Sequence, residues 1–277
     1  MNGGAGAQPP SDAASVTTLF AHGDPGNGEI TVAVPLYDHE RFIIPTLDSV
    51  LAQSLAGIEL TIVDDAGPGA ACATAFEWLE QHGNAFSSAR LLRHDRNRGS
   101  AAARNTAVNR AQTEFVFMLD SDNILFPTCL SRCLEALRSS GAAFAYPMLE
   151  VFGEEQNVMG LGLWDPHRLA YGNYIDTLAL VRREAWLAVG GATLMAVSGW
   201  NDYELWCKFA EHGYWGVQVP QILARYRVHR GSHLRTITNH PANIGPLIAE
   251  MQWLHPWLRL PTPPAADDAE SAVAPGP

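Results

Sequence analysis

Two aspartates separated by one residue, Asp120 and Asp122, follow an apolar run in the stretch EFVFMLDSDN. Two carboxylates placed in this way can raise each other's pKa, bind a divalent cation or cap a following helix. A second acidic pair, Asp64 and Asp65, ends another apolar run, IELTIVDDAG. A hard cation such as Mg2+ or Mn2+ neutralises paired carboxylates and keeps coordination positions free for phosphate oxygens. The presence of two acidic pairs after apolar runs favours the cation-binding interpretation.

Apolar runs alternate with helical patterns between about residues 29 and 125. Strand patterns cover residues 29–37, 58–67, 89–95 and 114–123, and helical patterns cover residues 44–55, 71–83 and 100–112, with Pro45 in the first turn of the first helix. This alternation predicts an α/β fold with a mostly parallel central sheet flanked by helices. In such sheets, ligands bind at the carboxyl ends of the strands. We therefore expect one crevice that collects the polar residues at the strand ends, which are Tyr37, Asp64, Asp65, Asp120 and Asp122.

The composition limits the class of protein. The chain has 277 residues, 47% of them hydrophobic and 17% charged, which suits a globular protein with a sizeable core. The net charge of −11 argues against nucleic acid as a partner. The sequence contains no apolar run long enough for a transmembrane segment, no secretory signal and no zinc-type cysteine spacing. We expect a location in the cytoplasm, either free or peripheral to a membrane.

No glycine-rich phosphate loop follows a strand, and no Walker-type lysine is present. If phosphate binds in the crevice, a metal must supply much of the counter-charge. The basic run RHDRNRGSAAARN can contribute to it, although a solvated or helix-capping role suits each of its arginines equally well. The Gly-, Ala-, Pro- and Ser-rich composition of residues 1–28 and 261–277 predicts disordered tails.

Four segments carry a family resemblance when they are taken in order between about Ile30 and Ser232. They are VAVPLYDHERFIIPTLDSVLAQSLAGIELTIVDDAG, NRGSAAARNTAVNRAQTEFVFMLDSDN, VRREAWLAVGG and GWNDYELWCKFAEHGYWGVQVPQILARYRVHRGS. This ordered set resembles the family 2 glycosyltransferases of GT-A fold. The resemblance implies one GT-A domain over residues 29–235, with a nucleotide-sugar-binding half (29–125) and an acceptor half (126–235). A helical extension is expected over residues 236–260.

The resemblance also implies roles for individual residues. It places the nucleotide sugar against Pro35, Tyr37, Asp64, Arg104, Asp120 and Ser121, the metal (Mn2+ or Mg2+) against Asp122, Asp120 and His229, and the acceptor against Trp200, Asn201 and Glu204. Asp202 is the expected general base, with Glu204 as an alternative base, and Asn201 stands where relatives carry an acid. The residues alone leave other interpretations open: Asp202 as a helix N-cap, His229 as a surface histidine and Trp200 as a packing residue.

The implied activity is a metal-dependent, inverting transfer of a sugar from a nucleotide-diphosphate sugar to an acceptor hydroxyl. A UDP-sugar is the expected donor, and a saccharide, a lipid or a small molecule is the expected acceptor; a homodimer is left open. The alternative is a catalytically degenerate GT-A module that binds a nucleotide or a protein partner without turnover. A nucleotidyltransferase is disfavoured, because PLYDHERF lacks the glycine and lysine of an activation loop.

Overall fold

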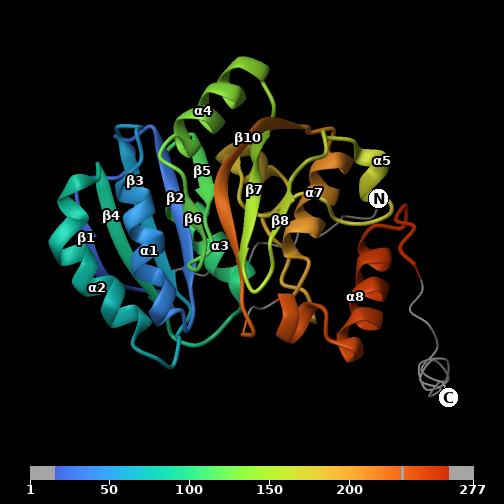
Figure 1. Ribbon diagram of the computed structural model, residues 1–277, viewed down its shortest axis with the longest axis horizontal. Coiled ribbons are helices and arrows are strands. Elements are labelled where there is room, and N and C mark those ends of the chain that lie inside the picture. The colour runs from blue at the N-terminus through green and yellow to red at the C-terminus, as the bar shows by residue number, and fades with distance from the viewer. Residues whose placement is uncertain (1–15, 232–233, 262–277) are drawn as a thin grey trace, which may run out of the picture.

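The structure of the chain is a computed structural model that describes residues 16–231 and 234–261. Ten strands form one sheet in these residues (Figure 1). They are β1 (Val16–His22), β2 (Ile30–Leu36), β3 (Ile58–Asp64), β4 (Ser88–His94), β5 (Phe115–Met118), β6 (Ile124–Leu125), β7 (Phe144–Gly153), β8 (Asn157–Met159), β9 (Leu180–Arg182) and β10 (Gly216–Val228). The order is β1-β4-β3-β2-β5-β9-β7-β10-β6, and β8 pairs with β7 outside this path.

Helices cover both faces of the sheet (Figure 1). The α-helices are α1 (Glu40–Leu51), α2 (Ala71–His82), α3 (Ser100–Arg110), α4 (Cys129–Ser140), α5 (Pro166–Leu169), α6 (Arg183–Ala188), α7 (Asn201–Glu211) and α8 (Pro241–Leu254). A short 3-10 helix spans Gly83–Ala85, and a π-helix spans Leu234–Thr238. None of the helices in the described ranges combines the length and the apolar character that crossing a membrane requires.

Two apolar cores lie on the two faces of the sheet. Strand β2 is buried along its whole length, so its successive side chains enter different cores. Val32 and Val34 belong to the core that includes residues of α1, α2 and α4, whereas Ala33 belongs to the core that includes residues of α3, α6, α7 and α8. Each fully buried Val or Leu side chain contributes about 1.5–3 kcal/mol relative to an exposed one. The small side chain of Ala33 and the alanines of α3 allow that helix to lie close to the sheet.

Strands β4, β3, β2 and β5 are parallel neighbours, in the arrangement expected from the alternating pattern. Their carboxyl ends therefore meet at one edge of the sheet, where the segments 37–39, 65–67, 95–99 and 119–123 follow. The strands beyond β5 are of mixed direction: β9 is antiparallel to β5 and β7, and β7 is parallel to β10. The predicted α/β architecture with a mostly parallel central sheet is confirmed.

Two local predictions are wrong. Residues 1–28 do not form a tail throughout, because Val16–His22 pairs with β4 as an antiparallel edge strand. Its residues are mostly exposed and gave no apolar pattern. The strand is held by its backbone pairing with β4 and by Phe20, whose ring packs against Phe76 of α2 at a centroid distance of 6.1 Å. Pro45 is not in the first turn of α1, since that helix begins at Glu40. Residues 1–15 and 262–277, parts of the two predicted tails, lie outside the described residues.

Candidate functional site

A large cavity of about 1400 Å3 opens at the carboxyl ends of the parallel strands. Its wall includes residues from the ends of β2 and β5, the loop before α3, the first turn of α7, the end of β10 and one side of α8. The sequence-predicted residues that line it are Pro35, Tyr37, Arg104, Asp120, Ser121, Asp122, Trp200, Asn201, Asp202 and His229. Asp64 and Glu204 are not part of this wall.

The turn that carries Asp120 and Asp122 is fixed from two sides. From α1, the hydroxyl of Thr46 donates to the carbonyl of Ser121 at 3.1 Å and to that of Asn123 at 2.8 Å. From β10, the backbone N–H of Arg227 donates to Asn123 Oδ1 at 2.8 Å. A buried turn held by both neighbours positions its two carboxylates with little freedom.

Asp120 and Asp122 face different partners. The guanidinium of Arg104, on α3, donates to Asp120 Oδ1 at 2.5 Å. Asp122 is 8% exposed, and its Oδ2 lies 3.3 Å from His229 Nε2. Burial, together with the nearby charge of Asp120, raises the pKa of Asp122. The protein therefore leaves the charge of Asp122 only partly compensated.

His39, Asp122 and His229 form a cluster of the kind that holds a metal ion. One ligand atom from each of these residues lies within 4.8 Å of the others. His39 is fixed by a hydrogen bond of 2.8 Å between its Nδ1 and Ser121 Oγ. The prediction of Asp122 and His229 as neighbours is consistent with this geometry, whereas Asp120 pairs with Arg104 instead.

Asp65, rather than Asp64, faces the cavity. Asp64 is fully buried, forms an ion pair with Arg93 at 2.6 Å and accepts a hydrogen bond from the backbone N–H of Gly67 at 3.2 Å. Asp65 accepts hydrogen bonds from the backbone N–H groups of Arg98 at 3.0 Å and Gly99 at 2.7 Å. The expected contact of Asp64 with a nucleotide is therefore not supported, because its side chain lies beneath the cavity wall.

Asp65 also contacts a buried histidine. Its Oδ1 lies 2.6 Å from Nδ1 of His94, whose Nε2 lies 2.9 Å from the hydroxyl of Thr106. The side chain of His94 is fully buried, so this histidine has no access to a substrate. It ties the end of β4 to α3 and holds the loop 95–99, which lines the cavity, in place.

Asp202 lies on the other side of the cavity, in the first turn of α7. The amide of Asn173 donates to Asp202 Oδ2 at 2.8 Å. Burial raises the pKa of Asp202, and a neighbouring carboxyl, Asp176, has its pKa raised strongly by burial and by the charge of Asp202. Burial and the same group of carboxylates raise the pKa of the phenol of Tyr226. A raised carboxyl pKa in a cavity is a feature that active sites share.

Three residues other than glycine have a positive φ in the described part of the chain, and all three adjoin cavity residues. They are Asp38 (φ 53°), Ala66 (φ 57°) and Trp200 (φ 51°). Such a conformation costs about 1–2 kcal/mol for a residue with a Cβ, and it concentrates at functional sites. Each of the three stands directly beside a predicted or observed site residue: Tyr37, Asp65 or Asn201.

The predicted acceptor residues separate into two groups. Trp200 lines the cavity and packs against Tyr203 with a centroid distance of 6.0 Å. Asn201 also lines it, but its amide donates inward to the carbonyl of Thr193 at 3.0 Å. Glu204 is 1% exposed and bonds to residues behind the cavity, so the structure does not place it where an acceptor or a reacting hydroxyl lies.

The sequence reasoning missed His39, Asn173, Asp176 and Tyr226. His39 had an available signal, since it is a potential metal ligand just after the first parallel strand. Asn173 and Asp176 lie in an irregular segment between α5 and β9, whereas Tyr226 lies on β10, and only the fold brings these three residues to the cavity.

Comparisons with known proteins identify the family. The family model described as Glycosyl transferase family 2 matches residues 31–198. The chain belongs to this family. It is a glycosyltransferase by family membership, as its named relatives are.

Several relatives and solved structures are similar to this glycosyltransferase. It is 25% identical over 211 residues to the putative teichuronic acid biosynthesis glycosyltransferase TuaG of Bacillus subtilis (strain 168), covering 73% of this chain and 80% of TuaG. It is 31% identical over 131 residues to the Escherichia coli glucosyltransferase WfgD, covering 47% of this chain and 49% of WfgD.

Among solved structures, TarS residues 1–349 of S. aureus superpose with a TM-score of 0.67 at 15% identity, covering 82% of this chain and 66% of that one. The mannosyltransferase PcManGT of Pyrobaculum calidifontis superposes with a TM-score of 0.63 at 20% identity, covering 87% of this chain and 68% of that one. At these identities the likeness establishes the shared fold.

Proposed function

We propose that this glycosyltransferase moves a sugar from a nucleotide-diphosphate sugar to an acceptor hydroxyl, with inversion at the anomeric carbon and with the help of a divalent cation. The observation that carries this proposal is the division of one cavity into two polar groups. His39, Asp122 and His229 form a cluster suited to a cation, and Asp202 lies apart from it in the first turn of α7. A transfer reaction needs both a cationic group at the leaving diphosphate and a separate base for the acceptor.

Relatives support the choice of donor. WfgD is named as an enzyme that uses UDP-Glc and acts on a GlcNAc-diphosphoundecaprenol, and TarS was solved in complex with UDP-GlcNAc. PcManGT was solved with GDP-Man and Mn2+. We expect a UDP-sugar as the donor of this chain. The acceptor, whether a saccharide, a lipid or a small molecule, lies in this proposal on the side of Trp200 and Asp202.

The donor set of the cluster fits a divalent cation. Asp122 offers a carboxylate whose raised pKa reflects incomplete compensation of its charge, and each of the two histidines offers an imidazole nitrogen. Because Mg2+ prefers an all-oxygen octahedral shell, imidazole ligands favour Mn2+. When bound, the cation neutralises the charge that develops on the departing nucleoside diphosphate.

The chain's own residues would do the rest. Arg104, held by Asp120, adds a fixed positive group close to the donor side. Tyr37, with 43% of its surface exposed, and Asp65 lie where the parallel strands end and are placed to contact the nucleoside. Asp202 would take the proton of the acceptor hydroxyl, and its raised pKa brings it closer to the operating pH, which makes it a better base. Asn173 orients the carboxylate by its hydrogen bond.

A thermal-shift panel of nucleoside diphosphates and nucleotide sugars, each with and without Mn2+ or Mg2+, tests the proposal. A ligand present at about a hundredfold excess over its dissociation constant stabilises the folded state by about 2.7 kcal/mol. We expect a shift that depends on the metal and is largest for UDP compounds. The absence of a shift with every nucleotide and metal would favour a degenerate module that binds a protein partner without turnover. The anomeric configuration of the product, determined by NMR, tests the inversion.

A further inference from the structure

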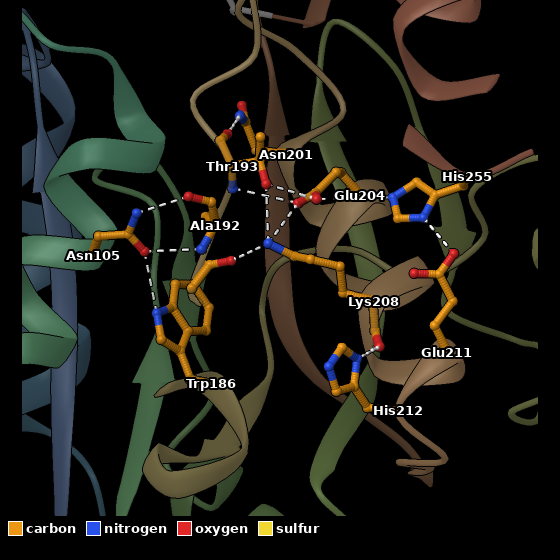
Figure 2. A network of polar contacts seen from close by, with 11 residues as sticks. Asn105, Trp186, Ala192, Thr193, Asn201, Glu204, Lys208, Glu211, His212 and His255 are labelled. Atoms are coloured by element: carbon orange, nitrogen blue, oxygen red, sulfur yellow. Dashed lines mark hydrogen bonds and ion pairs between the residues drawn. The ribbon is translucent and has the colours of Figure 1, made fainter. Parts of the chain in front are cut away.

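A network of polar groups links residues of α7 to Thr193 and to His255 (Figure 2). Glu204 is at its centre. Its carboxylate accepts a hydrogen bond from the hydroxyl of Thr193 at 2.7 Å and pairs with Lys208 Nζ at 3.2 Å. The imidazole of His255, from the end of α8, lies 3.8 Å from the same carboxylate.

The charges of this network are balanced. Burial alone would raise the pKa of Glu204, but His255, Lys208 and Thr193 hold it below its ordinary value. Glu211 lies 2.7 Å from the other nitrogen of His255. The two carboxylates therefore face Lys208 and, when it is protonated, His255; the side chains of Glu204 and His255 are almost fully buried, whereas that of Glu211 is 35% exposed. An unpaired buried charge would destabilise the fold here, whereas a set of buried charges and hydrogen-bonding groups that all have partners makes the elements it connects more rigid.

The segment Gly191–Thr193 is the point where the network meets the rest of the fold. Lys208 donates to the carbonyl of Gly191, and the amide of Asn201 donates to the carbonyl of Thr193 at 3.0 Å. From the opposite side, the side chain of Asn105 donates to the carbonyl of Ala192 at 2.7 Å and accepts from its N–H at 2.9 Å (Figure 2). The segment is therefore held between α7 and α3.

Two consecutive residues of α3 serve two sides of the cavity. Arg104 contacts Asp120 at the donor side, and Asn105 contacts Ala192 behind the base side. Glu204 lies two positions after Asp202 on α7, which is about 200° around the helix, so the two carboxylates point to different sides. Glu204 thus holds the first turn of α7 through contacts on the side of the helix opposite to Asp202.

We infer that Glu204 and Asn105 are positioning residues: together they clamp the segment Gly191–Thr193 and thereby hold Asp202 in a fixed place relative to Arg104 and Asp120. This inference rests on the proposed role of Asp202 as the base. Glu204 is not among the groups with the largest influence on the pKa of Asp202, which are Tyr203, Arg104, Asn173 and Asp120. Its effect on the reaction is therefore geometric, and it acts through the position of the first turn of α7.

The first experiment follows the clamp itself, by amide hydrogen exchange of the full chain. Glu204→Gln and Asn105→Ala should accelerate exchange over residues 191–202. The matched control is Glu211→Gln. Glu211 also lies on α7 and also contacts His255, but it does not contact Thr193. Exchange over residues 191–202 should therefore stay as in the wild type. Thr193→Val removes the hydrogen bond to Glu204 without changing a charge, so it repeats the test if Glu204→Gln does not fold.

The second experiment follows turnover of UDP-glucose and UDP-N-acetylglucosamine, measured as UDP release. For Glu204→Gln and Asn105→Ala, kcat should fall about 10-fold or more, because a misplacement of about 1 Å can cost about 100-fold. The dissociation constant of UDP and the acid limb of the pH–rate profile should be unchanged. Glu211→Gln should leave kcat unchanged.

Three outcomes would overturn the inference. One is wild-type exchange over residues 191–202 in Glu204→Gln and Thr193→Val. The second is an equal loss of kcat in Glu211→Gln, which would indicate a general loss of stability. The third is full turnover in Asp202→Asn but none in Glu204→Gln, which would make Glu204 the base. A wild-type chain without turnover, but with the expected exchange pattern, would instead refute the proposed function and leave the clamp established.

Discussion

The substitution Asp202→Asn is the most direct probe of the reaction. The amide has nearly the same shape as the carboxylate, and it retains an oxygen that can accept the hydrogen bond from Asn173. The fold and the donor side of the cavity should therefore be preserved. The variant loses only the ability to take a proton. Loss of a general base costs about 100-fold to 10,000-fold in rate, which corresponds to about 2.7 to 5.4 kcal/mol of transition-state stabilisation.

The assay compares kcat, the dissociation constant of UDP and the pH dependence of kcat/KM in the two proteins. Because burial raises the pKa of Asp202, wild-type activity should fall as the pH decreases through a value above 3.8, the ordinary pKa of an aspartate. The variant should lack this limb of the profile. A loss of UDP affinity that accounts for the whole loss of activity would refute the role of Asp202 as base and make it a binding residue. An unchanged kcat would refute it as well.

Three further outcomes are expected. Asp122→Ala should remove the Mn2+-dependent part of UDP binding in a thermal-shift assay, and binding that still requires Mn2+ would exclude Asp122 as a ligand. Asp65→Asn should weaken UDP binding about tenfold or more, since a hydrogen bond to a charged group contributes about 1.5–3 kcal/mol. Asp64→Asn should leave UDP affinity unchanged and affect only the melting temperature. Calorimetric titration of each variant with UDP distinguishes these two results. Burial alone would lower the pKa of His255, but the carboxylates of Glu204 and Glu211 raise it. Protonated His255 therefore stabilises the folded state fully below about pH 6.5. This stabilisation is lost as the pH rises through the pKa of His255 in the folded protein. Denaturant unfolding from pH 6 to 9 should show this loss in the wild type and not in His255→Gln.

The framework of the fold was predictable because it rests on apolar runs. The strands β2, β3 and β5 are buried on both faces, and such strands read as continuous apolar stretches in a sequence. The location of the site followed from the same information, since parallel strands end at one edge. What a single sequence does not specify is which of two adjacent carboxylates faces the cavity. Asp64 and Asp65 differ by one step of a strand, and one step reverses the direction of the side chain.

Other errors have different physical causes. The edge strand Val16–His22 lies in a polar, glycine-rich neighbourhood and buries little, so its pairing with β4 is visible only in three dimensions. The assignment of Glu204 to the cavity neglected helix geometry, because a residue two positions after Asp202 points away from it. The residues of the cluster, His39, Asp122 and His229, come from three segments far apart in sequence, and only the fold brings these segments together.

The electrostatics of the cavity bear on the choice between an enzyme and a degenerate module. Burial raises the pKa of Asp122, Asp176 and Asp202, so each of these groups, when ionised, makes the folded state less stable than an exposed carboxylate would. Neutral residues of the same size would relieve this cost without altering the fold. A module that only binds a partner gains nothing from buried carboxylates whose charge is not compensated. A transferase has two roles for such carboxylates, because one can bind the cation and another can accept the proton of the acceptor hydroxyl. The same reasoning indicates that metal binding should stabilise this chain more than the metal's contacts alone, since the cation relieves repulsion between carboxylates that the fold already contains.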